Sequence, residues 1–183
     1  MRRTVLTFGL IAGGILSIMM LATIPFMDRI GFDHGEVIGY TTMVAAFLLI
    51  FFGIRSYRDN VAGGSLSFGR AFSVGALIAV VASVCYVATW QLIYYKLAPD
   101  FMAKYQAHAV EKARASGASQ AAIDRRAAEM QRFAELYRNP AINVAITFIE
   151  PLPVGLIIAL VSAAILRRRP QTRAPAEKVV VAT

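Results

Sequence analysis

Glu150 is the side chain of this sequence best suited to chemistry, because it is a carboxylate inside a long apolar stretch from Ala141 to Leu166. A charged acid in hydrocarbon costs several kcal/mol unless it is protonated, paired or hydrated, so such residues are candidates for function. At 1.5 Å per residue, Glu150 lies about 14 Å beyond Ala141 along a helix, near the middle of a bilayer. At that depth its expected partners on other helices are Ser17, Ser83 and Tyr86.

Two prolines follow this acid, in the run Glu150-Pro151-Leu152-Pro153. Neither Pro151 nor Pro153 can donate a backbone hydrogen bond, so we predict a kink in the helix here. A kink that frees carbonyl groups beside a buried acid is typical of ion and proton sites in transporters. We favour the simpler interpretation, a protonated Glu150 hydrogen-bonded to a neighbouring helix, over proton handling or a substrate contact. The apolar stretches hold no Lys or Arg that could pair with it.

Other patterns that could carry chemistry are weak. The two histidines, His34 and His108, both lie in polar segments, so no Ser/His/Asp or Cys/His arrangement is indicated, and His108 is expected to be solvated. Asp33, His34 and Glu36 could contact a divalent cation but lack a fourth ligand. Gly63-Gly64 is not followed by the Lys-Ser/Thr of a phosphate-binding loop. We therefore predict no enzyme, no cofactor and no metal site.

The elements that must position these residues are membrane-spanning helices. The chain has 183 residues, 57% of them hydrophobic, and a mean hydropathy of +0.58, whereas soluble domains are about 45–50% apolar. Four stretches approach or exceed the roughly 20 residues that cross a bilayer, and in lipid each must be a helix. We predict an all-α membrane protein in which one domain, residues 1–169, has spans at about 4–26, 37–54, 71–95 and 141–166.

The first span follows Met1-Arg2-Arg3 and is too long for a signal peptide, so we expect it to stay uncleaved. Basic residues gather at the span ends on one side of the membrane, which predicts that both termini are cytoplasmic. The net charge of +8 is then explained by this topology signal, and we expect no nucleic-acid partner. The cytoplasmic basic anchors are Arg55, Arg58, Arg70, Arg167, Arg168 and Arg169. A tight turn is expected over residues 27–36, and a disordered cytoplasmic tail over 170–183.

The polar segment from about 99 to 139 is predicted to form an extracytoplasmic helical hairpin, with helices over 100–115 and 120–138 and a break at Gly117. On the second helix, apolar residues spaced seven positions apart form a stripe along one face: Ile123, Met130 and Tyr137. This stripe is either ordinary packing within the hairpin or a surface for a partner.

Small residues at four-residue spacing predict where the spans touch, because packing rather than the hydrophobic effect drives helix association in lipid. The clearest of these positions are Gly9, Gly13, Gly75, Ala79, Gly155 and Ala159. We expect contacts within one bundle, and the alternative is the face of a homo-oligomer.

Several motifs resemble those of the DUF4199 family, uncharacterised bacterial integral membrane proteins. One group of motifs is Arg55-Ser56-Tyr57-Arg58-Asp59-Asn60, Gly63-Gly64 and Ser67-Phe68-Gly69-Arg70-Ala71-Phe72. Other parts that look like the same family are Thr4-Val5-Leu6-Thr7-Phe8-Gly9, Gly35-Glu36-Val37-Ile38-Gly39-Tyr40 and Arg114-Ala115-Ser116-Gly117-Ala118-Ser119. The resemblance extends from about residue 1 to 169 and implies a multi-pass protein of a bacterial inner membrane. It implies no activity, substrate or catalytic residue.

Two functional hypotheses follow. The leading one is a non-enzymatic membrane protein whose partners are the lipid bilayer and either a second copy or another membrane protein, met by the hairpin stripe. The alternative is a small transporter or channel component built around Glu150 and its proline kink.

Overall fold

The computed structural model describes residues 1–167, which are almost entirely helical and contain no β-sheet. In chain order the elements are α1 (Arg2–Thr23), η1 (Ile24–Phe26), α2 (Met27–Ile30), α3 (Phe32–Asn60), α4 (Phe68–Leu92), the π-helical turn η2 (Ile93–Leu97), α5 (Phe101–Ala115), α6 (Gln120–Tyr137), α7 (Pro140–Ile149) and α8 (Pro151–Leu166). Arg168, Arg169 and the tail over 170–183, predicted to be disordered, lie outside the described residues.

Four continuous stretches are long and apolar enough to cross a membrane: Arg2–Ile30, Phe32–Asn60, Phe68–Leu97 and Pro140–Leu166. The prediction of an all-α membrane protein with four such helices is therefore confirmed. Large apolar side chains point away from the bundle, among them Ile18, Val84 and Ile157, which are 67%, 55% and 63% exposed. An outer surface of this kind suits lipid and would be unfavourable in water.

The turn predicted over residues 27–36 is much shorter than expected. Only Gly31 lies between α2 and α3, with a φ of 76° that favours glycine. Asp33, His34 and Glu36 are thus on the first turns of α3, because a helix can continue into the polar interface while its backbone hydrogen bonds stay satisfied. Likewise α3 continues to Asn60, which leaves a loop only over residues 61–67.

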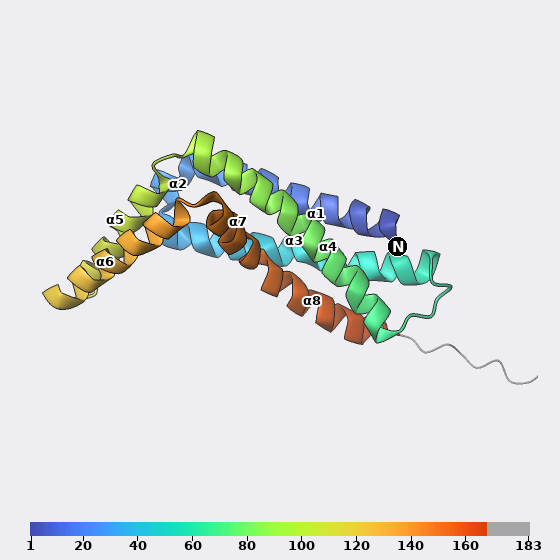
Figure 1. The fold of residues 1–183 in the computed structure, drawn as a ribbon. Helices are drawn as coiled ribbons and strands as arrows, with labels where there is room; N and C mark the ends of the chain where they lie inside the picture. Colours follow the sequence, from blue (N-terminus) through green and yellow to red (C-terminus); the bar gives the residue numbers. More distant parts are fainter. Residues whose placement is uncertain (168–183) are drawn as a thin grey trace, which may run out of the picture.

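Helix α4 lies at the centre of the bundle and packs against α1, α3 and α8, as Figure 1 shows. Against α1 the contact is close: a Cβ added to Gly9 would lie 2.7 Å from Cβ of Val81, and one added to Gly13 would lie 2.6 Å from Cβ of Cys85. The glycines allow the two backbones to approach at distances that any side chain would prevent.

The contact between α4 and α8 uses the other small residues. A Cβ on Gly75 would lie 2.8 Å from Cβ of Ala159, and a Cβ on Gly155 would lie 2.7 Å from Cβ of Ala79. The two pairs thus alternate glycine and alanine across one interface. The structure therefore places these six small residues in contacts within a single chain.

Helices α5 and α6 form a hairpin that projects at an angle from one end of the bundle (Figure 1). Its turn contains Gly117 at a φ of 74°, and the Gln106 amide donates a 2.9 Å hydrogen bond to the Met130 carbonyl. Ile123 and Tyr137, two members of the predicted stripe, are only 8% and 6% exposed. Met130, the third member, is half-buried. Packing within the chain thus covers two of the three stripe residues.

The two ends of the bundle differ in character. We call the end where α1 finishes, α3 begins and the hairpin attaches the hairpin end. At the opposite end α1 begins, α3 ends, α4 begins and α8 ends (Figure 1). The residues at or near these helix ends include Arg2, Arg55, Arg58, Arg70 and Arg167. Of these, Arg58 donates a 2.7 Å hydrogen bond to Asp59, and Arg55 lies 3.7 Å from the same carboxylate.

Candidate functional site

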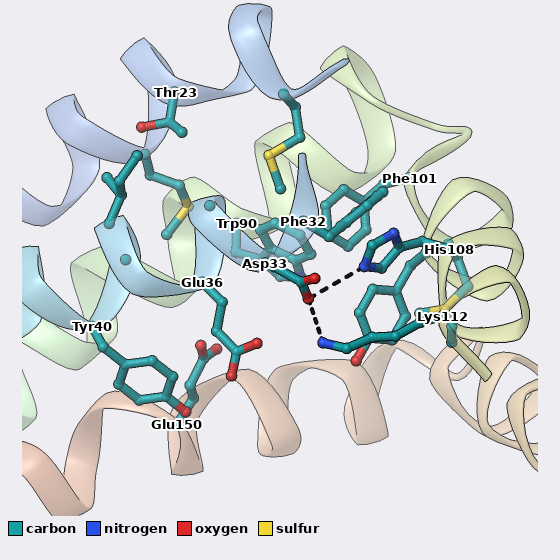
Figure 2. Close-up of a pocket in the computed structure, with 18 of the residues that line it drawn as sticks. Thr23, Phe32, Asp33, Glu36, Tyr40, Trp90, Phe101, His108, Lys112 and Glu150 are labelled. Atoms are coloured by element: carbon teal, nitrogen blue, oxygen red, sulfur yellow. Dashed lines mark hydrogen bonds and ion pairs between the residues drawn. The ribbon is translucent and has the colours of Figure 1, made fainter. Parts of the chain in front are cut away.

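A cavity of about 900 Å³ lies at the hairpin end. Its walls come from the ends of α1, α3 and α4, from both hairpin helices, and from the junction of α7 and α8 (Figure 2). Apolar and aromatic side chains form much of the lining, including Met20, Met27, Met43, Phe32 and Trp90. The volume lies within the range of small-molecule sites, about 300–1,000 Å³.

Glu150 lies at the interruption between α7 and α8 and lines this cavity. Its backbone stays helical, with φ −62° and ψ −57°, while the regular α-helix ends at Ile149 and restarts at Pro151. The Tyr86 hydroxyl donates a 3.1 Å hydrogen bond to Oε2 of Glu150. Pro151 is buried in the bundle, whereas Pro153 is exposed on its surface.

The two serines expected beside Glu150 lie elsewhere. Thr89 donates a 2.7 Å hydrogen bond to the Ser17 hydroxyl, so Ser17 joins α1 to α4. Ser83 is fully buried, and its hydroxyl has no hydrogen-bond partner among the described residues. Of the three expected partners, the structure brings only Tyr86 to Glu150.

A second carboxylate, Glu36 on α3, shares the cavity with Glu150. Figure 2 shows the two acids directed at the same space, with the Tyr40 ring beside Glu150. Neither acid has an ion pair with a basic side chain in residues 1–167, and the Tyr86 hydroxyl is the hydrogen-bond donor to Glu150 there. Two carboxylates that line one cavity favour a proton or another cation between them.

The third acid of the lining, Asp33, is neutralised by the hairpin. Lys112 on α5 donates a 2.6 Å hydrogen bond to Asp33, and Nε2 of His108 lies 3.3 Å from the same oxygen (Figure 2). This hydrogen bond raises the pKa of the Lys112 ammonium. The expectation of a solvated His108 was wrong, since its ring also packs 5.2 Å from that of Phe32.

A second ion pair holds the hairpin to the bundle. Lys104 on α5 donates a 3.0 Å hydrogen bond to Asp28 on α2 and lies 3.1 Å from Asp100. These contacts raise the pKa of Lys104, and the same ammonium lowers the pKa of Asp100. Beside them Phe32 packs edge-on against Phe101, at a centroid distance of 5.5 Å.

Hydrogen bonds join α4, α6 and α7 at the wall of the cavity that Trp90 and Tyr137 line, which we call the inner wall. The Trp90 indole donates a 2.8 Å bond to the Tyr137 hydroxyl, which lies 3.1 Å from Oγ1 of Thr147. Burial raises the pKa of the Tyr137 phenol, so this group stays neutral. Gln91 similarly donates a 2.8 Å bond to the fully buried Asn143.

After these pairings two acidic side chains of the cavity have no basic partner. Asp33 is matched by Lys112 and His108, and Arg126, which also lines the cavity, lies 3.5 Å from Glu129. Glu36 and Glu150 remain without a basic partner in the described part of the chain. Within residues 1–167, no three His, Cys, Asp or Glu side chains are grouped to hold a metal ion.

Sequence reasoning identified Glu150 and Tyr86 but missed Glu36 as a member of the same site. The spacing of Glu36, Tyr40 and Met43 at intervals of four and three residues carries a helical signal that could have placed them on one face. The docking of the hairpin by Lys104 and Lys112 had no comparable local signal.

The fold and the cavity define a small all-α membrane protein with four candidate spans and a helical hairpin at one end. A family model described as "Protein of unknown function (DUF4199)" matches residues 7–168, so the chain belongs to this family. No curated protein and no solved structure gives a significant match.

Proposed function

We propose that this protein is a non-enzymatic membrane protein that binds an amphipathic small molecule in the cavity at its hairpin end. The observation that carries the proposal is the cavity itself, whose apolar and aromatic walls converge on a few polar groups. Binding sites typically combine such a lining with a small number of placed polar side chains.

The distribution of charge supports an orientation for the cavity. Arg2, Arg55, Arg58, Arg70 and Arg167 lie at the opposite end, and basic residues near span ends favour the cytoplasmic side. We therefore propose a multi-pass inner-membrane protein with cytoplasmic termini and an outward-facing hairpin. A cysteine introduced at Ser116, with Cys85 replaced by alanine, should react with an impermeant maleimide added outside intact cells; reaction only after lysis would reverse the orientation.

Trp90 gives a direct test, because it is the single tryptophan of the chain and lines the cavity. The uncharged probe N-phenyl-1-naphthylamine should quench Trp90 fluorescence in detergent, with a saturable component at one probe per protein. Gly39→Leu should remove that component. Gly39 lines the cavity, and a Cβ added there meets no atom within 4 Å, so the side chain occupies free space.

The matched control is Gly14→Leu, at a helical glycine on α1 that does not line the cavity and likewise has no atom within 4 Å of an added Cβ. This variant should keep the saturable component. Equal quenching in both variants and the parent would show that the probe partitions into the micelle alone, and the proposed function would then be wrong.

A second candidate, transport, is favoured by one observation: Glu150 combines a cavity position with an interrupted helix. Helix breaks beside an acid give transporters a movable site. Vesicles reconstituted with the parent and with Glu150→Gln should differ in proton or cation flux if this is correct. No flux from either form would remove the candidate.

We also propose that the hairpin contacts a protein partner, through Leu136 instead of the predicted stripe. Ile123 and Tyr137 are covered, whereas Leu136 on α6 is 56% exposed. A photocrosslinker at Leu136 should capture a second copy or another membrane protein if the hairpin is a contact surface. Recovery of lipid adducts alone would argue against it.

A further inference from the structure

We infer that the ligand of this cavity is a lipophilic organic cation, an ammonium or phosphonium group that carries alkyl or aromatic substituents. The inference rests on the proposed function, since it names the class of molecule that the same cavity binds. Its basis is the juxtaposition of Glu36 and Glu150 with the aromatic lining around them (Figure 2).

The charge balance of the lining selects the sign of the ligand. The basic groups around the cavity are already engaged: Lys112 and His108 with Asp33, and Arg126 with Glu129. Glu36 and Glu150 have no such partner in residues 1–167. Both acids are exposed to the space of the cavity. A cationic ligand there would supply the missing countercharge, whereas an anion would meet two carboxylates without a basic partner.

The aromatic lining selects the same class. Tyr40 and Tyr86 lie beside Glu150, and Trp90, Phe101 and Tyr105 line the part of the cavity nearer the hairpin. Faces of aromatic rings attract cations, and the attraction grows when the cation is poorly hydrated. A small hydrated metal ion would gain little from these walls, while an organic cation would bury its substituents against them.

The size and walls of the cavity exclude a bare proton site as the whole explanation. About 900 Å³ is far more space than a shared proton needs, and methionines such as Met20, Met27 and Met43 provide an adaptable apolar wall. The arrangement fits a molecule with one cationic centre and a larger apolar body.

Tetraphenylphosphonium and tetraphenylborate test the inference, because they have the same shape and opposite charge. Binding is measured by equilibrium dialysis against purified protein in a non-ionic detergent, with empty micelles subtracted. We expect the cation to bind at least about tenfold more tightly than the anion, and Glu36→Gln or Glu150→Gln to weaken cation binding about tenfold each. Glu135→Gln, on the exposed face of α6 and outside the cavity, should change neither.

Equal affinity for the two ions, or cation binding that neither glutamine variant weakens, would overturn the inference. The uncharged naphthylamine probe is measured on the same samples. If it still shows a saturable component that Gly39→Leu abolishes, the glutamine variants are folded and the cavity binds ligands, so only the ligand class is wrong. If that component is absent from the parent, the proposed function fails as well.

Discussion

Exchanging glycine and alanine across the contact between α4 and α8, with Gly75→Ala and Ala159→Gly, tests the packing that supports the bundle. A Cβ added to Gly75 would lie 2.8 Å from Cβ of Ala159, well inside the roughly 3.5–4.0 Å preferred by carbon atoms. Gly75→Ala should therefore destabilise the protein. The reciprocal change, Ala159→Gly, removes the clashing methyl and should partly rescue it.

The size of the effect follows from two opposing contributions. Overpacking typically costs about 1–3 kcal/mol, whereas alanine is favoured over glycine within a helix by about 0.5–1 kcal/mol. The net loss for Gly75→Ala should be about 0.5–2 kcal/mol. Rescue is partial because the new Cβ would also lie 2.9 Å from Cδ1 of Ile54 and 3.0 Å from Cγ2 of Ile50, the flexible ends of side chains that can shift.

Reversible unfolding in mixed micelles, followed by circular dichroism, measures these free energies. The double variant should be more stable than the sum of the single effects predicts, with a coupling of about 1–2 kcal/mol. Gly14→Ala is the control, since its added Cβ meets nothing within 4 Å, and it should be neutral or slightly stabilising. Strictly additive effects, or a Gly75→Ala variant as stable as the parent, would refute the close contact.

Further predictions concern the hairpin and the inner wall. Since ion pairs raise the pKa of Lys104 and Lys112, their contribution to hairpin docking is complete below the ordinary lysine pKa and disappears as the pH rises through the raised values. At pH 8 the parent should melt at a higher temperature than the double variant Lys104→Met/Lys112→Met. The difference should be small because the ion pairs are exposed. If the same difference in melting temperature persists at pH 12, the ion pairs are not its cause. Tyr137→Phe should cost about 1–3 kcal/mol and shift Trp90 emission, because it removes the acceptor of the indole N–H. An unchanged spectrum and stability would show that this hydrogen bond is absent.

The spans could be predicted because their signal is local. Apolar length determines which segments suit lipid, and the small residues at positions 9, 13, 75, 79, 155 and 159 mark close contacts that depend only on helix periodicity. Depth alone suggested Tyr86 together with Ser17 and Ser83, and only Tyr86 contacts Glu150. Depth gives the height of a residue in the membrane but not the face of its helix.

The cavity could not be predicted, because it depends on how the hairpin folds back. Lys112 pairs with Asp33 across 79 positions of sequence, and Lys104 pairs with Asp28 across 76. Polar residues at Asp33 and Glu36 resembled a turn, although the helix continues through them. The stripe of Ile123, Met130 and Tyr137 was recognised, but periodicity cannot tell whether such a face meets its own chain or another.

Mapping the attachment site of a photoreactive cation tests the central claim most directly. A benzophenone that carries a quaternary ammonium group is irradiated with the purified protein, and mass spectrometry locates the adducts. The structure predicts labels on cavity residues such as Met20, Met27 and Trp90, with tetraphenylphosphonium as competitor. Labels confined to outward-facing residues such as Ile18, Val84 and Ile157, unaffected by the competitor, would contradict the account.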